Sequence, residues 1–262
     1  GEPVPIPLSE FFDQAYQMIL QRDPEGMLEL GLVADPDAPQ ALTCISLACE
    51  QETGQLYQAL LNELHTYDYD SLDPFDQVSY QVFEWFLVEG IREIEWANFE
   101  YLVSPLSVRS YPQLFLMFFT ESHPMNTPAD AEGYVARLHL LDEKVDQLIE
   151  RLEAQAEAGF IAPRMVIEYG RSDVKNYLGY AASASPLRSV FLSKTADINN
   201  LEDAARTALE DELMTALQEE VFPAFDRLDD TLAALQAQAP EVIGLSAYEG
   251  GLDYYNWLLH YY

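Results

Sequence analysis

Apolar residues recur at the spacing of one helix face in two long segments of the chain. The first segment begins at Thr127-Pro128, which is typical of a helix N-terminus, and ends at Gly159. The second runs from Leu209 to Leu235, and Pro223 inside it predicts a kink. Both patterns predict long helices with one buried face. The stripe of the first segment consists of Tyr134, Leu138, Leu141, Val145, Leu148 and Leu152.

The other segments also favour helices. Ser9 is a plausible N-cap for a first helix that Asp23-Pro24 would end, and residues 41–65 repeat apolar positions at helical spacing. Residues 74–101 are apolar around most of the helix circumference, which predicts a central helix buried on several sides. A last helix is expected over residues 252–262. The apolar positions of the expected central helix include Val78, Val82, Trp85, Phe86, Ile91, Ile94 and Trp96.

The chain shows no alternating strand pattern, no hairpin dipeptide of the Asn-Gly type and no repeat of fixed period. No break in composition of the linker kind divides it. The sequence therefore predicts an all-α fold, an irregular multi-helix bundle with long amphipathic helices and no significant sheet. Residues 1–262 are expected to form a single helical unit.

The charge of the chain narrows the classes of partner. Thirteen Lys and Arg residues stand against 45 Asp and Glu residues, which gives a formal net charge of −32. A surface this negative repels phosphate backbones and anionic lipids, so nucleic-acid and membrane-surface roles are disfavoured. No apolar run approaches the roughly 20 residues that a membrane span needs.

The two cysteines, Cys44 and Cys49, lie five residues apart in the segment predicted as a helix. On a helix this spacing places them about 140° apart around the axis, so a mutual disulfide is not expected. The interpretation that remains is two small, half-buried apolar residues. No signal peptide is visible, because the chain opens directly with the polar, Pro-rich segment GEPVPIPLSE.

Known chemical motifs are missing from the sequence. His65, His123, His139 and His260 are 58, 16 and 121 residues apart, so none forms the His-Glu-x-x-His pattern of a zinc helix. The acidic loop at 68–73 lacks the Gly and Glu that an EF-hand requires at its sixth and twelfth positions. The sequence around Ser246 lacks the final Gly of the G-x-S-x-G pattern that a nucleophile elbow requires. With 45 acidic residues, no carboxylate pair stands out as an acid/base couple.

Three stretches of the chain resemble the bacterial family known as domain of unknown function 885. The closing stretch is similar to a "GlsalPgG…yY" signature of that family, although Glu249 stands here where the family tends to have Pro. The resemblance covers nearly the whole chain. The three stretches are FFDQAYQMILQRDPEGMLELGL, TPADAEGYVARLHLLDEKVDQLIERLEAQAEAGFIAPRMVI and IGLSAYEGGLDYYNWLL.

The resemblance implies more about function than the residues do by themselves. Members of the family are longer, all-helical and often exported, and their later half carries a zinc signature of the HExxPGH kind, which makes them similar to zinc metallopeptidases or carboxypeptidases. None of those ligand positions occurs in this chain. The resemblance therefore implies the non-catalytic N-terminal half of such a hydrolase, forming one wall of the substrate cleft, with zinc held only by the full-length protein.

The expected partners and location follow from the same resemblance. The expected partners are the C-terminal metal-binding half of the same protein and a peptide substrate. The expected location is extracellular or in the cell envelope, with the cytoplasm as the alternative. This chain alone is not expected to be an enzyme or to hold a metal. The alternative function is a stand-alone acidic helical module for binding or assembly.

The closing segment supplies the candidate site residues. Aromatic side chains there occupy both faces of the expected last helix, which is more than one buried stripe needs. Either the segment lines a cleft, or it folds back and is buried against the aromatic cluster at 114–119. The candidate cleft residues are Gly250, Gly251, Tyr254, Tyr255 and Trp257.

Overall fold

The computed structural model describes residues 6–32, 40–103, 110–241 and 244–261, and within these ranges it contains helices and no strand. The predicted all-α fold is confirmed. The α-helices are α1 (Leu8–Leu20), α2 (Pro24–Glu29), α3 (Leu47–Leu64), α4 (Pro74–Glu95), α5 (Tyr111–Met117), α6 (Pro128–Leu138), α7 (Leu141–Glu157), α8 (Arg164–Leu178), α9 (Pro186–Thr195), α10 (Asp203–Ala216), α11 (Phe222–Gln238) and α12 (Gly251–Tyr261).

Short helical turns join several of these helices. Four are 3₁₀ turns, and two are π-helical. Pro223 has no N–H for the carbonyl four residues earlier, and the π-helical turn Leu217–Val221 ends two residues before it. The 3₁₀ turns are Tyr69–Ser71, Ala97–Phe99, Ala182–Ala184 and Leu245–Ala247, and the π-helical turns are Phe118–Ser122 and Leu217–Val221.

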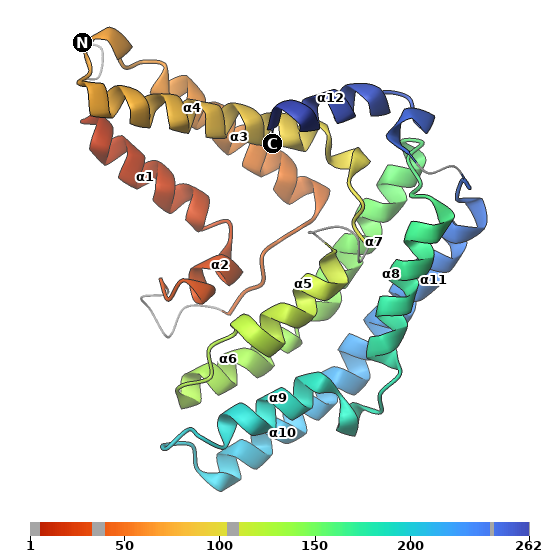
Figure 1. Ribbon diagram of the computed structural model, residues 1–262. Helices are drawn as coiled ribbons and strands as arrows, with labels where there is room; N and C mark the ends of the chain where they lie inside the picture. Colours follow the sequence, from red (N-terminus) through yellow and green to blue (C-terminus); the bar gives the residue numbers. More distant parts are fainter. Residues whose placement is uncertain (1–5, 33–39, 104–109, 242–243, 262) are drawn as a thin grey trace.

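The described residues form two apolar clusters. The smaller one joins α1, α3 and α4, and we call α1–α4 the arm. The larger one joins α5–α11, and we call these helices the body. Figure 1 shows α1, α3 and α4 together at one end of the molecule and α9 and α10 at the other. The prediction of a single helical unit over residues 1–262 stays a prediction.

The apolar stripe at 134–152 is buried in the body as predicted, with Leu138, Val145 and Leu148 fully inaccessible. The segment consists of two helices, however, because the chain turns at His139-Leu140 between α6 and α7. Its N-terminus is the predicted one: Thr127 and Asp130 form a capping box, and Pro128 is the first residue of α6. Gly159 follows the end of α7 with a φ of 88°.

A second, polar face of α7 is also buried and attaches the arm to the body. Lys144 pairs with Glu25 of α2 at 2.6 Å, and Arg151 pairs with Glu50 of α3 at 2.6 Å. Lys144 and Arg151 are only 4% and 2% exposed. The other contacts are Gln147 Oε1 accepting from the Ile45 amide and Gln155 Nε2 donating to the carbonyls of Ala97 and Glu100. Because Lys144, Gln147, Arg151 and Gln155 are three or four residues apart, they share one face of the helix.

The prediction that the helix at 74–101 is buried on several sides is wrong. The helix α4 ends at Glu95, and only Tyr80 and Leu87 on it are buried. Val82 and Trp85 are 61% and 52% exposed. The spacing of apolar residues shows which of them share a helix face. That face is buried only where another element packs on it, and the described part of the chain covers only part of α4.

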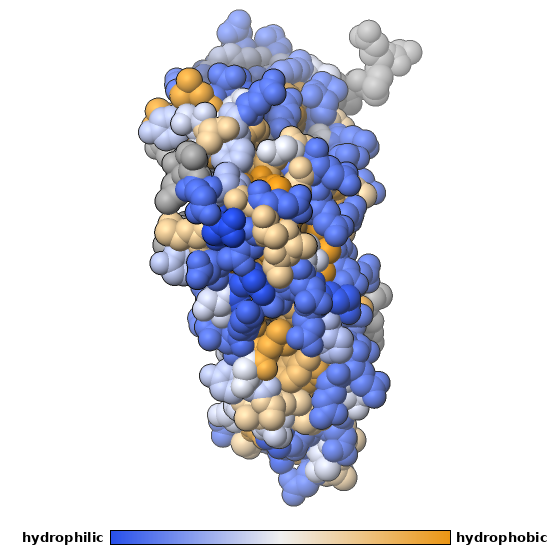
Figure 2. All heavy atoms as spheres, turned by 90° about the vertical axis from the view of Figure 1, so that its right-hand side faces the viewer, coloured by the Kyte–Doolittle hydropathy of each residue, from blue (hydrophilic) through white to orange (hydrophobic). Residues whose placement is uncertain are grey.

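The α8 and α11 side of the molecule has a different surface. Figure 2 shows it as mostly hydrophilic, with apolar groups in small separate areas.

The expectation that Cys44 and Cys49 do not pair is also wrong. Their sulfur atoms form a disulfide, with Cα atoms 6.1 Å apart. The helix begins at Leu47, with Ser46 accepting from the Cys49 amide as its N-cap, so Cys44 lies in the extended segment before it. The angular argument fails because it placed both residues on the helix. The disulfide joins this extended segment to the first turn of α3.

This disulfide generates a stability prediction. It closes a loop of about six residues, so replacing both cysteines by Ala should lower the free energy of unfolding by about 2 kcal/mol. Urea unfolding with and without a reductant measures it, and the reductant should have no effect on the double variant. Intact mass should show two hydrogens fewer in the oxidised protein, and finding two free thiols after purification in air would contradict the pairing.

Candidate functional site

Of the five candidate residues of the closing segment, Gly250 directly precedes α12 and the other four lie in its first seven residues. A Cβ at Gly251 would lie 1.8 Å from the carbonyl oxygen of Leu245, and Gly250 has a φ of 77°. Both positions therefore require glycine for the chain to turn into α12. Tyr254 is buried, whereas Tyr255 is 48% exposed on the other side of the helix.

Aromatic contacts and one hydrogen bond place α12 against α4. The Tyr254 ring stacks on Phe99, with ring centroids 5.2 Å apart, and lies 5.8 Å from Trp96. The Trp257 indole N–H donates to Glu89 at 2.9 Å. The helix therefore folds back, but onto α4 and the turn after it rather than onto the aromatic cluster at 114–119. The structure brings Tyr254 and Trp257 together with α4, while Tyr255 points away from it.

Exposed apolar side chains remain around this contact, as the cleft interpretation requires. On α12 they are Leu252, Tyr255 and Leu259, which are 61%, 48% and 61% exposed. Their assignment to a substrate cleft stays a prediction. The five candidate residues line neither the cavity, nor the groove, nor the apolar pocket described next.

A polar cavity of about 160 Å³ lies where the arm meets the body. It has room for several water molecules, and three carboxylates line it together with the hydroxyls of two tyrosines and one threonine. Arg151 lies beside it, 3.5 Å from Glu100 and with its guanidinium donating to the Tyr111 hydroxyl at 2.8 Å. The polar lining residues are Glu50, Glu93, Glu100, Tyr57, Tyr111 and Thr53.

Burial dominates the electrostatics of this cavity. It raises the pKa of Glu50, and the nearby carboxylates Glu100 and Glu93 raise it further, while the Arg151 guanidinium lowers it. The pKa of Tyr111 is raised by burial as well. Sequence reasoning could not find this cluster, because Glu50 lies on α3, Glu93 on α4 and Glu100 after the following 3₁₀ turn. The one feature of the sequence that indicates this cluster is Arg151. It is a cation next to the apolar position Leu152, in a chain that has few cations.

A larger open groove of about 570 Å³ lies beside the disulfide, between α1, α2 and α3. Its volume lies within the range of small-molecule sites. Arg22 is the cation in its lining, and the guanidinium donates to Thr53, to the Cys49 carbonyl and to Glu52. These bonds hold Arg22 within the arm. The lining residues are Met18, Gln21, Arg22, Pro24, Leu42, Cys44, Cys49, Glu52 and Leu56.

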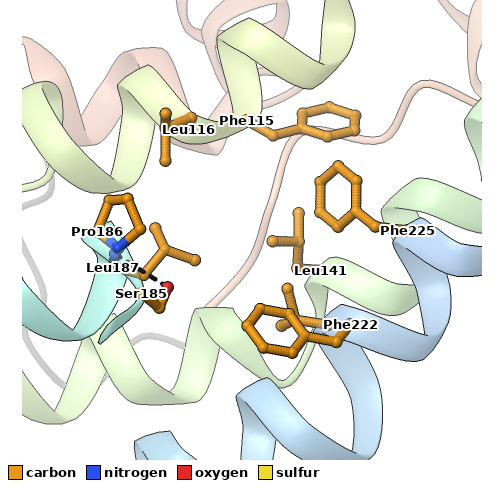
Figure 3. Close-up of a pocket in the computed structure, with 9 residues that line it drawn as sticks. Phe115, Leu116, Leu141, Ser185, Pro186, Leu187, Phe222 and Phe225 are labelled. Carbon is orange, nitrogen blue, oxygen red and sulfur yellow. Dashed lines mark hydrogen bonds between the residues drawn. The ribbon is translucent and has the colours of Figure 1, made fainter. Parts of the chain in front are cut away.

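The body holds an apolar pocket between α5, α7, α9 and α11 (Figure 3). Phe115, Leu141 and Phe225 point into it, and the Ser185 hydroxyl in its wall already accepts from the Leu187 amide. Its volume of about 10 Å³ is at the lower limit for one water molecule. This pocket is a packing gap that is too small for a ligand.

The histidines lie apart, and no group of three or more metal-ligating side chains gathers among the described residues. His65 pairs with Glu84, and His139 lies between Glu220 at 2.7 Å and Glu212 at 3.6 Å. His123 is 2% exposed. Its Nδ1 donates to the Pro124 carbonyl, and its Nε2 accepts from Arg137 at 3.1 Å. The acidic loop at 68–73 has a structural role, because Asp73 caps α4.

Arg151 should be the residue on which the junction depends most. Replacing it with Met removes the cation that lies 2.6 Å from the half-buried Glu50, so Arg151→Met should lower the free energy of unfolding by about 3 kcal/mol. Arg227→Met is the matched control, because Arg227 pairs with Asp146 at 2.7 Å but is 46% exposed. That variant should lose no more than about 1 kcal/mol in the same urea titration. Equal losses would contradict the structural role of Arg151.

His123 should make stability depend on pH. Burial lowers its pKa to about 4, and the neighbouring Arg137 charge lowers it as well. Between about pH 6.5 and pH 4 the unfolded chain takes up a proton that the folded chain refuses, so the free energy of unfolding falls as the pH falls, by up to about 3 kcal/mol. His123→Phe should remove this part of the slope, and His65→Phe, at an exposed histidine, should keep it. Parallel slopes for the wild type and His123→Phe would show that His123 titrates normally.

Comparison with known proteins places the chain in a wider context. The model of the family described as "Bacterial protein of unknown function (DUF885)" matches residues 24–262. A crystal structure described as the "putative lipoprotein from Colwellia psychrerythraea" has a similar fold, with a TM-score of 0.76 and 17% identity. The match covers 92% of this chain and 44% of that one, so the chain spans less than half of its solved neighbour. No curated protein matches.

Proposed function

Because the chain belongs to the DUF885 family of bacterial proteins of unknown function, we propose that it is the non-catalytic N-terminal helical half of a longer zinc-dependent hydrolase, similar to a peptidase or carboxypeptidase. In this proposal it forms one wall of the substrate cleft. The observation that carries the proposal is the coverage of the solved neighbour: nearly all of this chain corresponds to less than half of that protein. The reaction class rests on the sequence resemblance.

The surface of α12 supports the assignment to a cleft wall. Tyr254 and Trp257 attach the helix to α4 and its following turn. The same helix presents Tyr255 outward, next to a turn that requires glycine at 250 and 251. An exposed aromatic side chain on a rigid helix is suited to contact a substrate backbone or side chain. In this proposal, Tyr255 is the residue that touches the substrate.

An exported location is part of the same proposal. The solved neighbour is described as a "putative lipoprotein", which favours the cell envelope. The disulfide between Cys44 and Cys49 also favours an oxidising compartment, since disulfides are rare in the cytosol. Among the residues that the structure describes, no helix combines the length and the apolar character that a membrane span requires.

The proposal predicts how metal and activity divide between this chain and the longer protein. After chelator washing, residues 1–262 alone should hold no tightly bound zinc and should not hydrolyse peptides, because zinc catalysis needs about three protein ligands and an open position. The protein made from the complete reading frame should hold about one zinc per chain. Metal analysis and a peptide-release assay measure both. Stoichiometric zinc in residues 1–262, or a complete protein without zinc or hydrolysis, would contradict the proposal.

A variant of the complete protein tests the cleft wall itself. Tyr255→Ala should raise KM about three- to tenfold, the worth of one aromatic contact, and leave the zinc content unchanged. Tyr180→Ala is the matched control, because Tyr180 is 49% exposed and Tyr255 48%. An unchanged KM for Tyr255→Ala would remove Tyr255 from the cleft.

A further inference from the structure

One stripe of side chains runs along the whole length of α4 at intervals of three and four residues. Its first part, which we call the open stripe, consists of Phe75, Val78 and Val82, which are 79%, 59% and 61% exposed. The stripe continues through Trp85 and Glu89 to Trp96, directly after the helix. The spacing places all these residues on one face of the helix. An apolar stripe this exposed marks an interaction surface.

The helix α12 already packs against the second part of the stripe, although Trp85 remains 52% exposed. Tyr254 lies against Trp96, Trp257 donates to Glu89, and Tyr261 stacks on Trp85 with ring centroids 6.0 Å apart. Residue numbers rise along α12 as they fall along α4, so the two helices are antiparallel. Figure 1 shows the C-terminal end of α12 directed along α4 toward the beginning of that helix. The contact with α12 ends at Trp85, and the open stripe lies directly beyond it, toward the beginning of α4.

We propose that the polypeptide after position 262 continues α12 along α4 and covers the open stripe. This rests on the proposed function, in which the chain is part of a longer protein. From Trp85 to Phe75 is ten residues of α4, or about 15 Å, so about ten further residues of helix are enough. The continuation should carry apolar residues at intervals of three and four after Tyr261, extending the series Tyr254, Trp257 and Tyr261.

Helix register and charge indicate which polypeptide covers the open stripe. The path of the continuation is already set, because α12 fixes its direction, its distance from α4 and its starting point at Trp85. A second copy of this chain is a weaker choice, since each copy brings a formal charge of −32 and the two repel each other. In this proposal α12 and its continuation form one continuous interface with α4, distinct from the outward face that carries Tyr255.

Thiol labelling tests this inference. Both cysteines of residues 1–262 are in the disulfide, so Val78→Cys adds one free thiol to this part of the protein, and Ala208→Cys on the exposed face of α10 is the control. Both variants are made in residues 1–262 and in the complete protein, and maleimide labelling rates are compared. Val78→Cys should react about tenfold more slowly in the complete protein than in residues 1–262, because reaction then needs a local opening. Ala208→Cys should react equally in both.

The outcomes separate this inference from the proposed function. A complete protein that holds zinc and hydrolyses peptides, but labels Val78→Cys as fast as residues 1–262 do, overturns the inference alone. Protection in residues 1–262 that grows with protein concentration assigns the open stripe to a second copy and also overturns it. A protected Val78→Cys in a complete protein without zinc supports the inference and contradicts the proposed function. A reading frame that ends at position 262 overturns both.

Discussion

The buried polar face of α7 is the constraint on which the arrangement of the arm and the body depends. Lys144 and Arg151 are almost inaccessible to solvent, and a buried charge without a partner is costly. Their partners Glu25 and Glu50 come from the arm, so the arm can lie only where it supplies them. The opposite, apolar face of α7 packs in the body. The single helix α7 thereby fixes the position of both apolar clusters. The disulfide constrains the segment before α3, which connects the two clusters.

This arrangement leaves α4 at the edge of the molecule rather than in its centre. Its inner face packs on α1 and α3, α12 covers one part of its outer face, and the open stripe remains exposed. The match to less than half of a longer solved structure agrees with a surface of this kind. We propose that this part of the molecule serves two purposes, with Tyr255 facing the substrate and the open stripe receiving the rest of the protein.

Periodicity in the sequence predicted the fold class and the buried stripe from Tyr134 to Leu152, because each depends on spacing within a helix. The errors arose where neighbours in space decide. The exposure of Val82 and Trp85 depends on which helix covers α4, and the disulfide depends on α3 beginning at Leu47, after Cys44. The cluster around Arg151 draws its carboxylates from separate elements, so no spacing along the chain identifies it. The closing segment packs Tyr254 and Trp257 against α4 and its following turn and leaves Tyr255 exposed, and its assignment to a substrate cleft stays a prediction.

Hydrogen exchange in the Arg151→Met variant tests most directly whether this polar face attaches the arm. Amides of α3 and α4 should exchange much faster in the variant than in the wild type, while those of α7 and α11 keep their protection, because the body retains its own apolar cluster. A uniform loss of protection over α3, α4, α7 and α11 would contradict it, since the arm and the body would then unfold as one unit whose cohesion does not depend on Arg151.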